Sequence, residues 1–276
     1  MGVQITAKEA FDNLAAALDT FSDSETYQAF LKRVSKLHKY SPFNTHLIFS
    51  QNKDASKVAG FRAWGKLNRR VKKGESALTI LVPITFDKEK ADGTTSKQMI
   101  FKPKNCVFDI SQTELIDPAK GDPVNDAPAW VTRGDSDLFE IIRDVVIADG
   151  ATVEVVPNLM LNGTALGRYI VNFKQIEIVE MNTAAMACVL LHEWAHHRVH
   201  GDGTTYSYDQ EEVIVESISY VIAQTLGIQQ PTETSSFVYI TNWLRDDKDK
   251  FKKAVSVIQK EAHAMIELLS GGEDVA

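Results

Sequence analysis

Residues 183–200 have the sequence TAAMACVLLHEWAHHRVH, which contains an HExxH motif from His192 to His196. Apolar residues precede the motif, and Asn182 or Thr183 can cap a helix at its start, so we expect a helix here. Residues four apart on a helix lie one turn apart, with Cβ atoms ~5–6 Å from each other. Two imidazoles in that arrangement can bind one Zn²⁺. The motif therefore predicts a zinc site at His192 and His196, with Glu193 beside it as a general base rather than a ligand.

A catalytic zinc site needs a third protein ligand, and the next predicted helix, 209–226, offers two carboxylates. Glu212 can form a capping box with Asp209, which gives it a structural role. Glu216 lies in an apolar run, where an unpaired carboxylate would be costly to bury, and it follows His196 by 20 positions. That spacing is close to the one in thermolysin-like zinc peptidases, so Glu216 is the predicted third ligand and Glu212 the alternative. For stabilising an oxyanion, the sequence offers Tyr206, Tyr208, Tyr239 and His263.

The composition limits the classes of protein to be considered. The chain has 276 residues, 44% of them apolar and 24% charged, which excludes wholesale disorder and a collagen-like chain. No apolar run approaches the ~18 residues of a membrane helix, so we expect no membrane association. Cys106 and Cys188 cannot form a disulfide framework. A cytoplasmic location is therefore expected.

The net charge of −7 is unevenly distributed along the chain. Residues 1–104 contain 18 Lys and Arg and 10 Asp and Glu, a balance of +8, and the remainder has a balance of −15. A cationic segment with interleaved aromatic residues is typical either of a solvated helix face or of a groove for single-stranded nucleic acid. The residues in question are Lys53, Lys57, Arg62, Trp64, Lys66, Arg69, Arg70, Lys72 and Lys73.

The hydrophobic pattern predicts two α+β domains. Residues 116–129 contain three prolines and three aspartates, a composition typical of a linker. We therefore expect a basic domain at 1–115, a linker at 116–134 and a second domain at 135–276. The expected helices lie near 7–21, 25–39, 61–68, 137–149, 183–200, 209–226 and from 234 onwards, and the expected strands near 77–86, 98–110, 152–156, 168–171 and 175–179.

Several motifs in order resemble the ArdC-type antirestriction proteins. In the N-terminal half these are YSPFN at 40–44, LI at 47–48, Gln51, VAGF at 58–61 with Trp64, VKKGE at 71–75, VP at 82–83 and VFDISQT at 107–113. In the C-terminal half the resemblance rests on the HExxH motif, residues 212–220 and SSFVYITNW at 235–243.

The resemblance implies a two-domain protein that protects incoming DNA of a mobile element. Its N-terminal domain would bind single-stranded DNA through the cationic segment, and its C-terminal domain would be a zincin-like metallopeptidase domain that binds zinc and acts on a protein or peptide. Two alternatives remain. One is a zinc metallopeptidase of the repressor-cleaving type without DNA binding. The other is a DNA-binding protein whose zinc is only structural.

Overall fold

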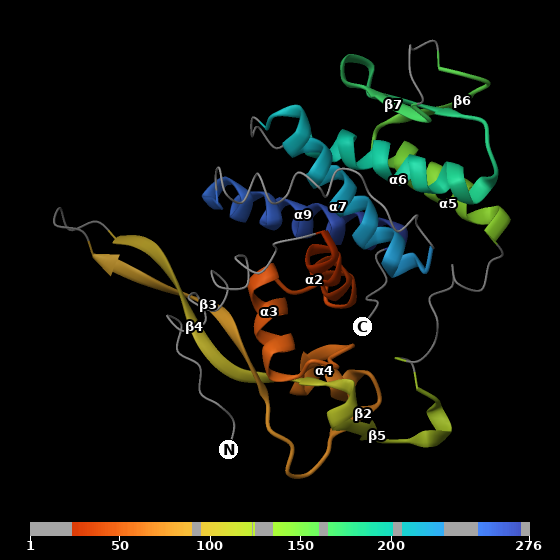
Figure 1. Ribbon diagram of the computed structural model, residues 1–276. Helices are drawn as coiled ribbons and strands as arrows, with labels where there is room; N and C mark the ends of the chain where they lie inside the picture. Colours follow the sequence, from red (N-terminus) through yellow and green to blue (C-terminus); the bar gives the residue numbers. More distant parts are fainter. Residues whose placement is uncertain are drawn as a thin grey trace. The chain divides into compact units, whose positions relative to one another are not determined.

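The computed structural model describes residues 24–89, 95–122, 124, 135–159, 165–200, 206–228 and 248–271, which form two compact units. The first unit comprises the described residues between 42 and 126. The second comprises those of 24–41 and 135–271. Both units contain helices and strands (Figure 1), as the α+β prediction requires.

The first unit is built on a long antiparallel hairpin, with a short strand paired to its second arm and a separate two-stranded sheet nearby. The hairpin consists of β3 (Leu78–Glu89) and β4 (Thr95–Asp109), the long yellow strands of Figure 1. The other elements are α3 (Pro42–Gln51), β1 (Val58–Gly60), α4 (Phe61–Lys66), β2 (Arg69–Val71), β5 (Thr113–Leu115) and the 3-10 helices Ile110–Gln112 and Pro118–Lys120.

Side-chain amides attach α3 to the hairpin. Asn44 donates to the carbonyl oxygen of Leu81 at 3.0 Å and accepts from its N–H at 2.8 Å. Gln51 makes the same pair of bonds with Thr79, at 2.9 and 2.8 Å. Each side-chain amide bonds both the N–H and the carbonyl oxygen of one β3 residue, as the backbone of a neighbouring strand would. Asn44 and Gln51, two residues of the N-terminal motifs, are therefore structural.

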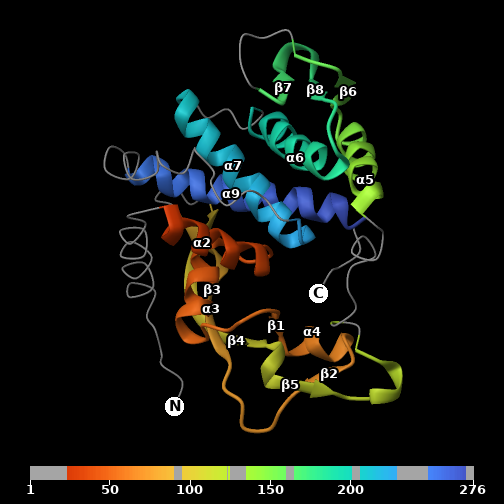
Figure 2. The same ribbon diagram turned by 45° about the vertical axis from the view of Figure 1, so that its right-hand side comes forward.

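The second unit combines a three-stranded sheet with helices. Strand β6 (Thr152–Val156) runs parallel to β8 (Gln175–Val179), and β7 (Gly167–Ile170) pairs with the other side of β8 in the antiparallel sense. Helix α6 packs against β7, β8, α5 and α7, as Figure 2 shows. The helices are α2 (Ser24–Lys36), α5 (Asp135–Ala148), α6 (Thr183–Val199), α7 (Tyr208–Leu226) and α9 (Lys248–Leu269), with a 3-10 helix at Val171–Phe173.

The structure draws the boundary between the two parts differently from the sequence-based division at residue 115. Helix α2 belongs to the C-terminal unit, because its apolar face packs against α7 and buries Tyr27 completely. The Tyr27 hydroxyl also hydrogen-bonds with Oγ of Ser217 at 3.0 Å. A helix from the N-terminal end of the chain therefore completes the core of the C-terminal unit.

The described part of the predicted linker is attached to the first unit. The Asn68 side chain donates to the carbonyl oxygens of Asp117 and Gly121, at 2.8 and 3.1 Å. Arg69 forms an ion pair with Asp122. Residues 116–122 are therefore held against β2 by side-chain contacts that the proline-rich composition does not reveal.

Most predicted elements agree with the structure to within a few residues. The expected helix at 7–21 and the stretch 234–247 lie outside the described residues. Among the described helices, none has the length and apolar character needed to span a bilayer.

Candidate functional site

Two helices of the second unit present the predicted metal-binding residues. Asn182 caps α6, where its side chain accepts from the N–H of Ala185 at 2.9 Å. The indole N–H of Trp194, a fully buried residue, donates to Oδ2 of Asp149 at 2.7 Å. These contacts fix the rotation of α6, so that His192 and His196 lie on the side that faces α7.

The two histidines converge on one carboxylate of α7. Nε2 of His192 lies 3.5 Å from Oε2 of Glu212, and Nε2 of His196 lies 3.4 Å from its Oε1. The three side chains are 14–24% exposed. A carboxylate thus lies against the Nε2 atoms of both imidazoles.

The opposite nitrogen of each ring faces a carboxylate of its own. Nδ1 of His192 lies 3.2 Å from Glu216, and Nδ1 of His196 lies 3.0 Å from Glu211. In metal sites such outer partners hold the tautomer and the orientation of a ligating ring. Glu211 also pairs with His200 at 2.9 Å.

The structure therefore places Glu212, the alternative, where the sequence reasoning expected Glu216. The capping role that the sequence assigned to Glu212 is not present in α7. Its N-cap is Ser207, whose N–H donates to Oε1 of Gln210 at 3.2 Å, so the helix begins two residues before the predicted Asp209 cap. Glu212 has no capping role in this arrangement and points toward α6, while Glu216 reaches only the far nitrogen of His192.

The spacing of the three ligand atoms fits a tetrahedral ion. Ligand atoms ~2.0–2.1 Å from a zinc ion lie about 3.3 Å from one another at tetrahedral corners. The nitrogen–oxygen distances of 3.4 and 3.5 Å are close to that edge, and all three ligand atoms lie within 4.8 Å of one another. The residues present thus fit a divalent metal.

Without a metal, the cluster is held together by charge. Burial lowers the pKa of His192, but hydrogen bonds with Glu212 and Glu216 outweigh burial and raise it to about 10. The pKa of His196 is also raised, because its bonds with Glu211 and Glu212 outweigh burial. Burial would raise the pKa of Glu212, yet the two histidines hold it well below its usual range.

Glu193 lies between α6 and the strand β7. It is only 7% exposed, and burial raises the pKa of its carboxyl group despite the nearby histidines. A backbone hydrogen bond from Tyr169 on β7 reaches its side chain. A Cβ at Gly167 would lie 2.9 Å from Oε1 of Glu193 and 2.5 Å from Cγ1 of Val189. Only glycine lets β7 approach the Glu193 carboxylate this closely.

Among the four residues considered for an oxyanion, the structure brings one to the cluster. The hydroxyl of Tyr208, a 77% exposed residue, hydrogen-bonds with Glu212. The ring of Tyr206 lies under the ammonium group of Lys250, 5.4 Å from the ring centroid. His263 belongs to a different group of side chains, and Tyr239 lies outside the described residues.

In the first unit, two of the predicted DNA-binding residues are buried. Trp64 is 1% exposed and its indole N–H donates to the carbonyl oxygen of Phe108 at 3.0 Å, so its ring cannot stack on a base. Arg69 is 9% exposed and its guanidinium pairs with Asp122 and donates to Thr113. Both residues hold the fold, because their polar groups are used within the unit.

The remaining predicted cations keep more contact with solvent. Lys57 is half-buried and donates to the carbonyl oxygen of Val124. The exposed cations are Lys53, Arg62, Lys66, Arg70, Lys72 and Lys73. Of these, Arg70 pairs with Glu114, and Lys72 donates to the carbonyl oxygen of Ser111. Phe61, at the start of α4, is 63% exposed. An exposed aromatic ring next to Arg62 is therefore the one to consider for stacking, in place of Trp64.

Sequence reasoning missed Glu211, which faces His196, and Gly167, which lies against Glu193. The sequence could have indicated Glu211, because it belongs to the same acidic start of α7 as Glu212. Gly167 had no such signal, because its contact with Glu193 joins a strand and a helix that are separated in the sequence.

Comparison with known proteins agrees with the resemblance seen in the sequence. Residues 9–108 match the family described as the N-terminal domain of anti-restriction factor ArdC. Curated proteins give no significant match.

Two solved structures of one protein resemble this chain. The metal-free crystal structure of the antirestriction ArdC protein from the R388 plasmid is 20% identical, with a TM-score of 0.52, over 84% of this chain and 86% of that chain. The Mn(II)-bound structure of that protein is 18% identical, with a TM-score of 0.48, over 86% of this chain and 85% of that chain. This chain therefore carries the N-terminal domain of the anti-restriction factor ArdC and shares the fold of an ArdC protein, which confirms the resemblance of its sequence to the ArdC-type antirestriction proteins.

Proposed function

We propose that this chain is an ArdC-like antirestriction protein with two activities. Its second unit carries a zinc-dependent metallopeptidase-type site, and its first unit binds single-stranded DNA. The observation that carries the proposal for the second unit is the convergence of His192 Nε2 and His196 Nε2 on Glu212, with Glu193 beside them.

His192, His196 and Glu212 would hold the metal, and Glu211 and Glu216 would orient the two imidazoles. A divalent ion there supplies Lewis-acid polarisation of a carbonyl group and lowers the pKa of water. The donor set of two imidazoles and one carboxylate leaves a fourth tetrahedral position open, as catalytic zinc sites do and structural sites do not.

Glu193 has the environment of a general base. Its raised pKa brings the carboxylate closer to the working pH, where a base both holds its correct protonation state and accepts a proton effectively. Among the described strands, β7 forms one edge of its sheet, β6 forms the other, and β7 runs past Glu193. An extended peptide can add to such an edge as a further strand, which would bring its main chain to the site.

The test of the peptidase activity is Glu193→Gln, with Glu140→Gln on the exposed face of α5 as control. We expect the wild type and the control to cleave members of a peptide library, read out by mass spectrometry. Glu193→Gln should keep the metal and lose cleavage by several orders of magnitude, because water loses its proton acceptor. Equal cleavage by Glu193→Gln would contradict the assignment. Retained metal with no cleavage by the wild type would favour a structural role for zinc.

Exposed positive charge and one exposed aromatic ring support single-strand binding by the first unit. Single-strand binders combine cations that neutralise phosphates with aromatic side chains that stack on bases. The exposed cations of this segment, together with Phe61 at 63% exposure, have this composition. Four phosphate contacts would give a log–log slope of affinity against salt of about −3.

The full chain is the proper sample for the DNA test, because residues 24–41 belong to the core of the second unit. Fluorescence titration should show tighter binding of single-stranded than of duplex DNA, with little sequence preference. Charge reversal at Lys66, Lys72 and Lys73 should flatten the salt slope and weaken all sequences about equally. Lys174→Glu, an exposed cation of the second unit, is the control and should leave binding unchanged. Equal affinity for duplex would contradict the proposal.

A further inference from the structure

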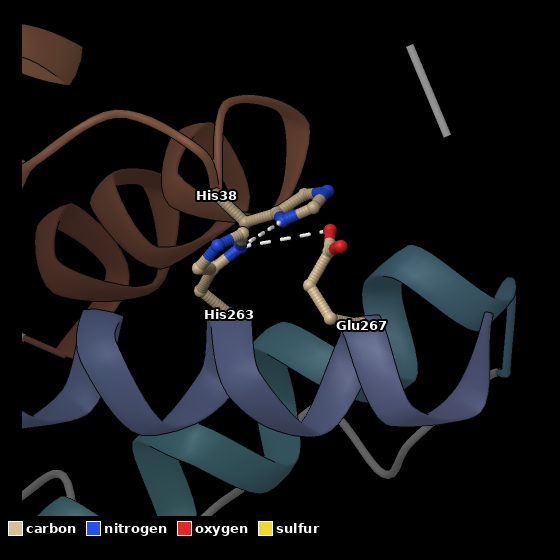
Figure 3. A group of neighbouring side chains, drawn as sticks. All are labelled: His38, His263 and Glu267. Atoms are coloured by element: carbon tan, nitrogen blue, oxygen red, sulfur yellow. Dashed lines mark hydrogen bonds and ion pairs between the residues drawn. The ribbon is translucent and has the colours of Figure 1, made fainter. Parts of the chain in front are cut away.

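A second group of two histidines and one carboxylate lies in the C-terminal unit, away from the HExxH helix. His38 stands in the turn that follows α2, and His263 and Glu267 stand one turn apart on α9. Figure 3 shows the two imidazole rings and the carboxylate pointing toward one another. The proposed peptidase site uses none of these three residues.

One distance within the group matches that of two ligands sharing an ion, and a second is slightly longer. Nδ1 of His38 lies 3.1 Å from Nδ1 of His263, and Nδ1 of His263 lies 3.9 Å from Oε1 of Glu267. Tetrahedral ligands of zinc lie about 3.3 Å apart. The Glu267 oxygen would have to move roughly 0.6 Å closer to His263 to reach this ligand–ligand distance. Rotation about one side-chain bond of Glu267 can supply such a movement.

Hydrogen bonding alone leaves the group incomplete. Two neutral imidazoles can share one N–H between their Nδ1 atoms, which accounts for the contact of His38 with His263. Oε1 of Glu267 is nevertheless buried, without a hydrogen-bond partner among the described residues. The 3.9 Å to His263 is too long for a hydrogen bond. A buried carboxylate oxygen without a partner is costly.

We propose that His38, His263 and Glu267 form a second metal site, for Zn²⁺ or another divalent transition metal. Two imidazole nitrogens and one carboxylate oxygen are a donor set that suits such ions. The ion would take both Nδ1 lone pairs and the unpartnered Glu267 oxygen. The His263 side chain is 40% exposed and that of Glu267 is 32% exposed. Solvent thus reaches the site, which gives an ion a way in and water a fourth position.

The site would tie distant parts of the unit together. His38 and His263 are 225 positions apart in the sequence, and the ion would link the segment after α2 to α9. Because the site does not exist in the unfolded chain, its binding energy stabilises the folded unit. The role that follows is a structural one, separate from the chemistry at Glu193.

Counting zinc in site-specific variants of the full chain tests the proposal. Chelator-treated protein is dialysed against Zn²⁺ and its metal content is measured by elemental analysis. We expect two ions per chain for the wild type, one for His263→Ala, one for His192→Ala/His196→Ala, and none when all three substitutions are combined. Loss of one ion in the double variant reports on the first centre, and loss in His263→Ala reports on the second. The two proposals can therefore fail separately.

Two further variants guard against loss of fold. Glu267→Gln keeps the size of the side chain. In the His192→Ala/His196→Ala background it should weaken zinc binding by about 100-fold or more, since loss of even an outer-shell partner costs 10–100-fold. Lys260→Ala, an exposed position of α9, should still bind two ions. Circular dichroism of each metal-free variant checks the fold. A folded His192→Ala/His196→Ala chain that binds no zinc, or a His263→Ala chain that binds as much as the wild type, would overturn the proposal.

Discussion

Substituting the three carboxylates of α7 one at a time distinguishes the metal ligand from its supporting residues. Glu216→Gln replaces the carboxylate 3.2 Å from Nδ1 of His192 by a neutral amide, and Glu211→Gln does the same 3.0 Å from Nδ1 of His196. Mutation of such an outer partner costs about 10–100-fold in metal affinity, or about 1.4–2.7 kcal/mol. Glu212→Gln neutralises the carboxylate that lies against both Nε2 atoms. Glu212→Gln should therefore lower metal affinity by more than about 100-fold, because the metal loses a charged ligand.

Zinc affinity is best measured by competition with a chromophoric chelator, in the His263→Ala background so that only one site is counted. Glu211→Gln and Glu216→Gln act as matched controls for each other, since each neutralises the outer carboxylate of one histidine. We expect both to bind zinc with affinities within about tenfold of each other, and Glu212→Gln to bind far more weakly. If Glu216→Gln lost the metal while Glu212→Gln behaved like Glu211→Gln, the reasoning would be refuted and Glu216 would be the ligand.

Three other predictions concern the surroundings of the metal centre and the first unit. Gly167→Ala should lower the free energy of unfolding in urea by about 1–3 kcal/mol, the usual cost of overpacking, because the new Cβ meets Val189 and Glu193. An unchanged stability would contradict the close approach of β7 to α6. Metal binding at pH 7.5 should release at least one proton, because the pKa of His192, at about 10, and the raised pKa of His196 favour protonated imidazoles in the metal-free protein. Zinc affinity should therefore rise with pH above 7.5. Calorimetry in two buffers of different ionisation enthalpy measures the release, and its absence would refute the expectation. Phe61→Ala should weaken single-stranded DNA binding by about 1–3 kcal/mol with little change in salt slope, and an unchanged affinity would exclude stacking by this ring.

The site was largely predictable where it depends on local sequence. The helix expected at 183–200 agrees with α6, and the geometry places His192 and His196 on the face that the HExxH spacing requires. The choice between Glu212 and Glu216 depended on where the next helix begins. With the N-cap at Ser207, Glu212 has no capping role, and N-cap positions are among the least reliable features of a sequence-based assignment. Glu212 and Glu216 are four residues apart and lie on the same face of α7, so the packing of α7 on α6 decides which of them reaches the Nε2 atoms.

The features that sequence reasoning missed depend on tertiary contacts. Trp64 belongs to a cationic segment with aromatic residues, yet its indole is buried against Phe108. The helical spacing of Phe61 and Trp64 left open which ring faces the core. The packing of α2 on α7, and with it the placement of His38 near His263, joins segments about 200 residues apart. A sequence pattern within one helix does not indicate which distant helix it packs against.

Anomalous diffraction from crystals of the zinc-loaded full chain, recorded at the zinc absorption edge, tests the central claim most directly. We expect a strong anomalous peak bonded to Nε2 of His192, Nε2 of His196 and the carboxylate of Glu212, with Glu193 beside it but not coordinated. No peak at these residues in a fully zinc-loaded crystal, or a peak bonded to Glu193, would contradict a catalytic metal centre in this protein.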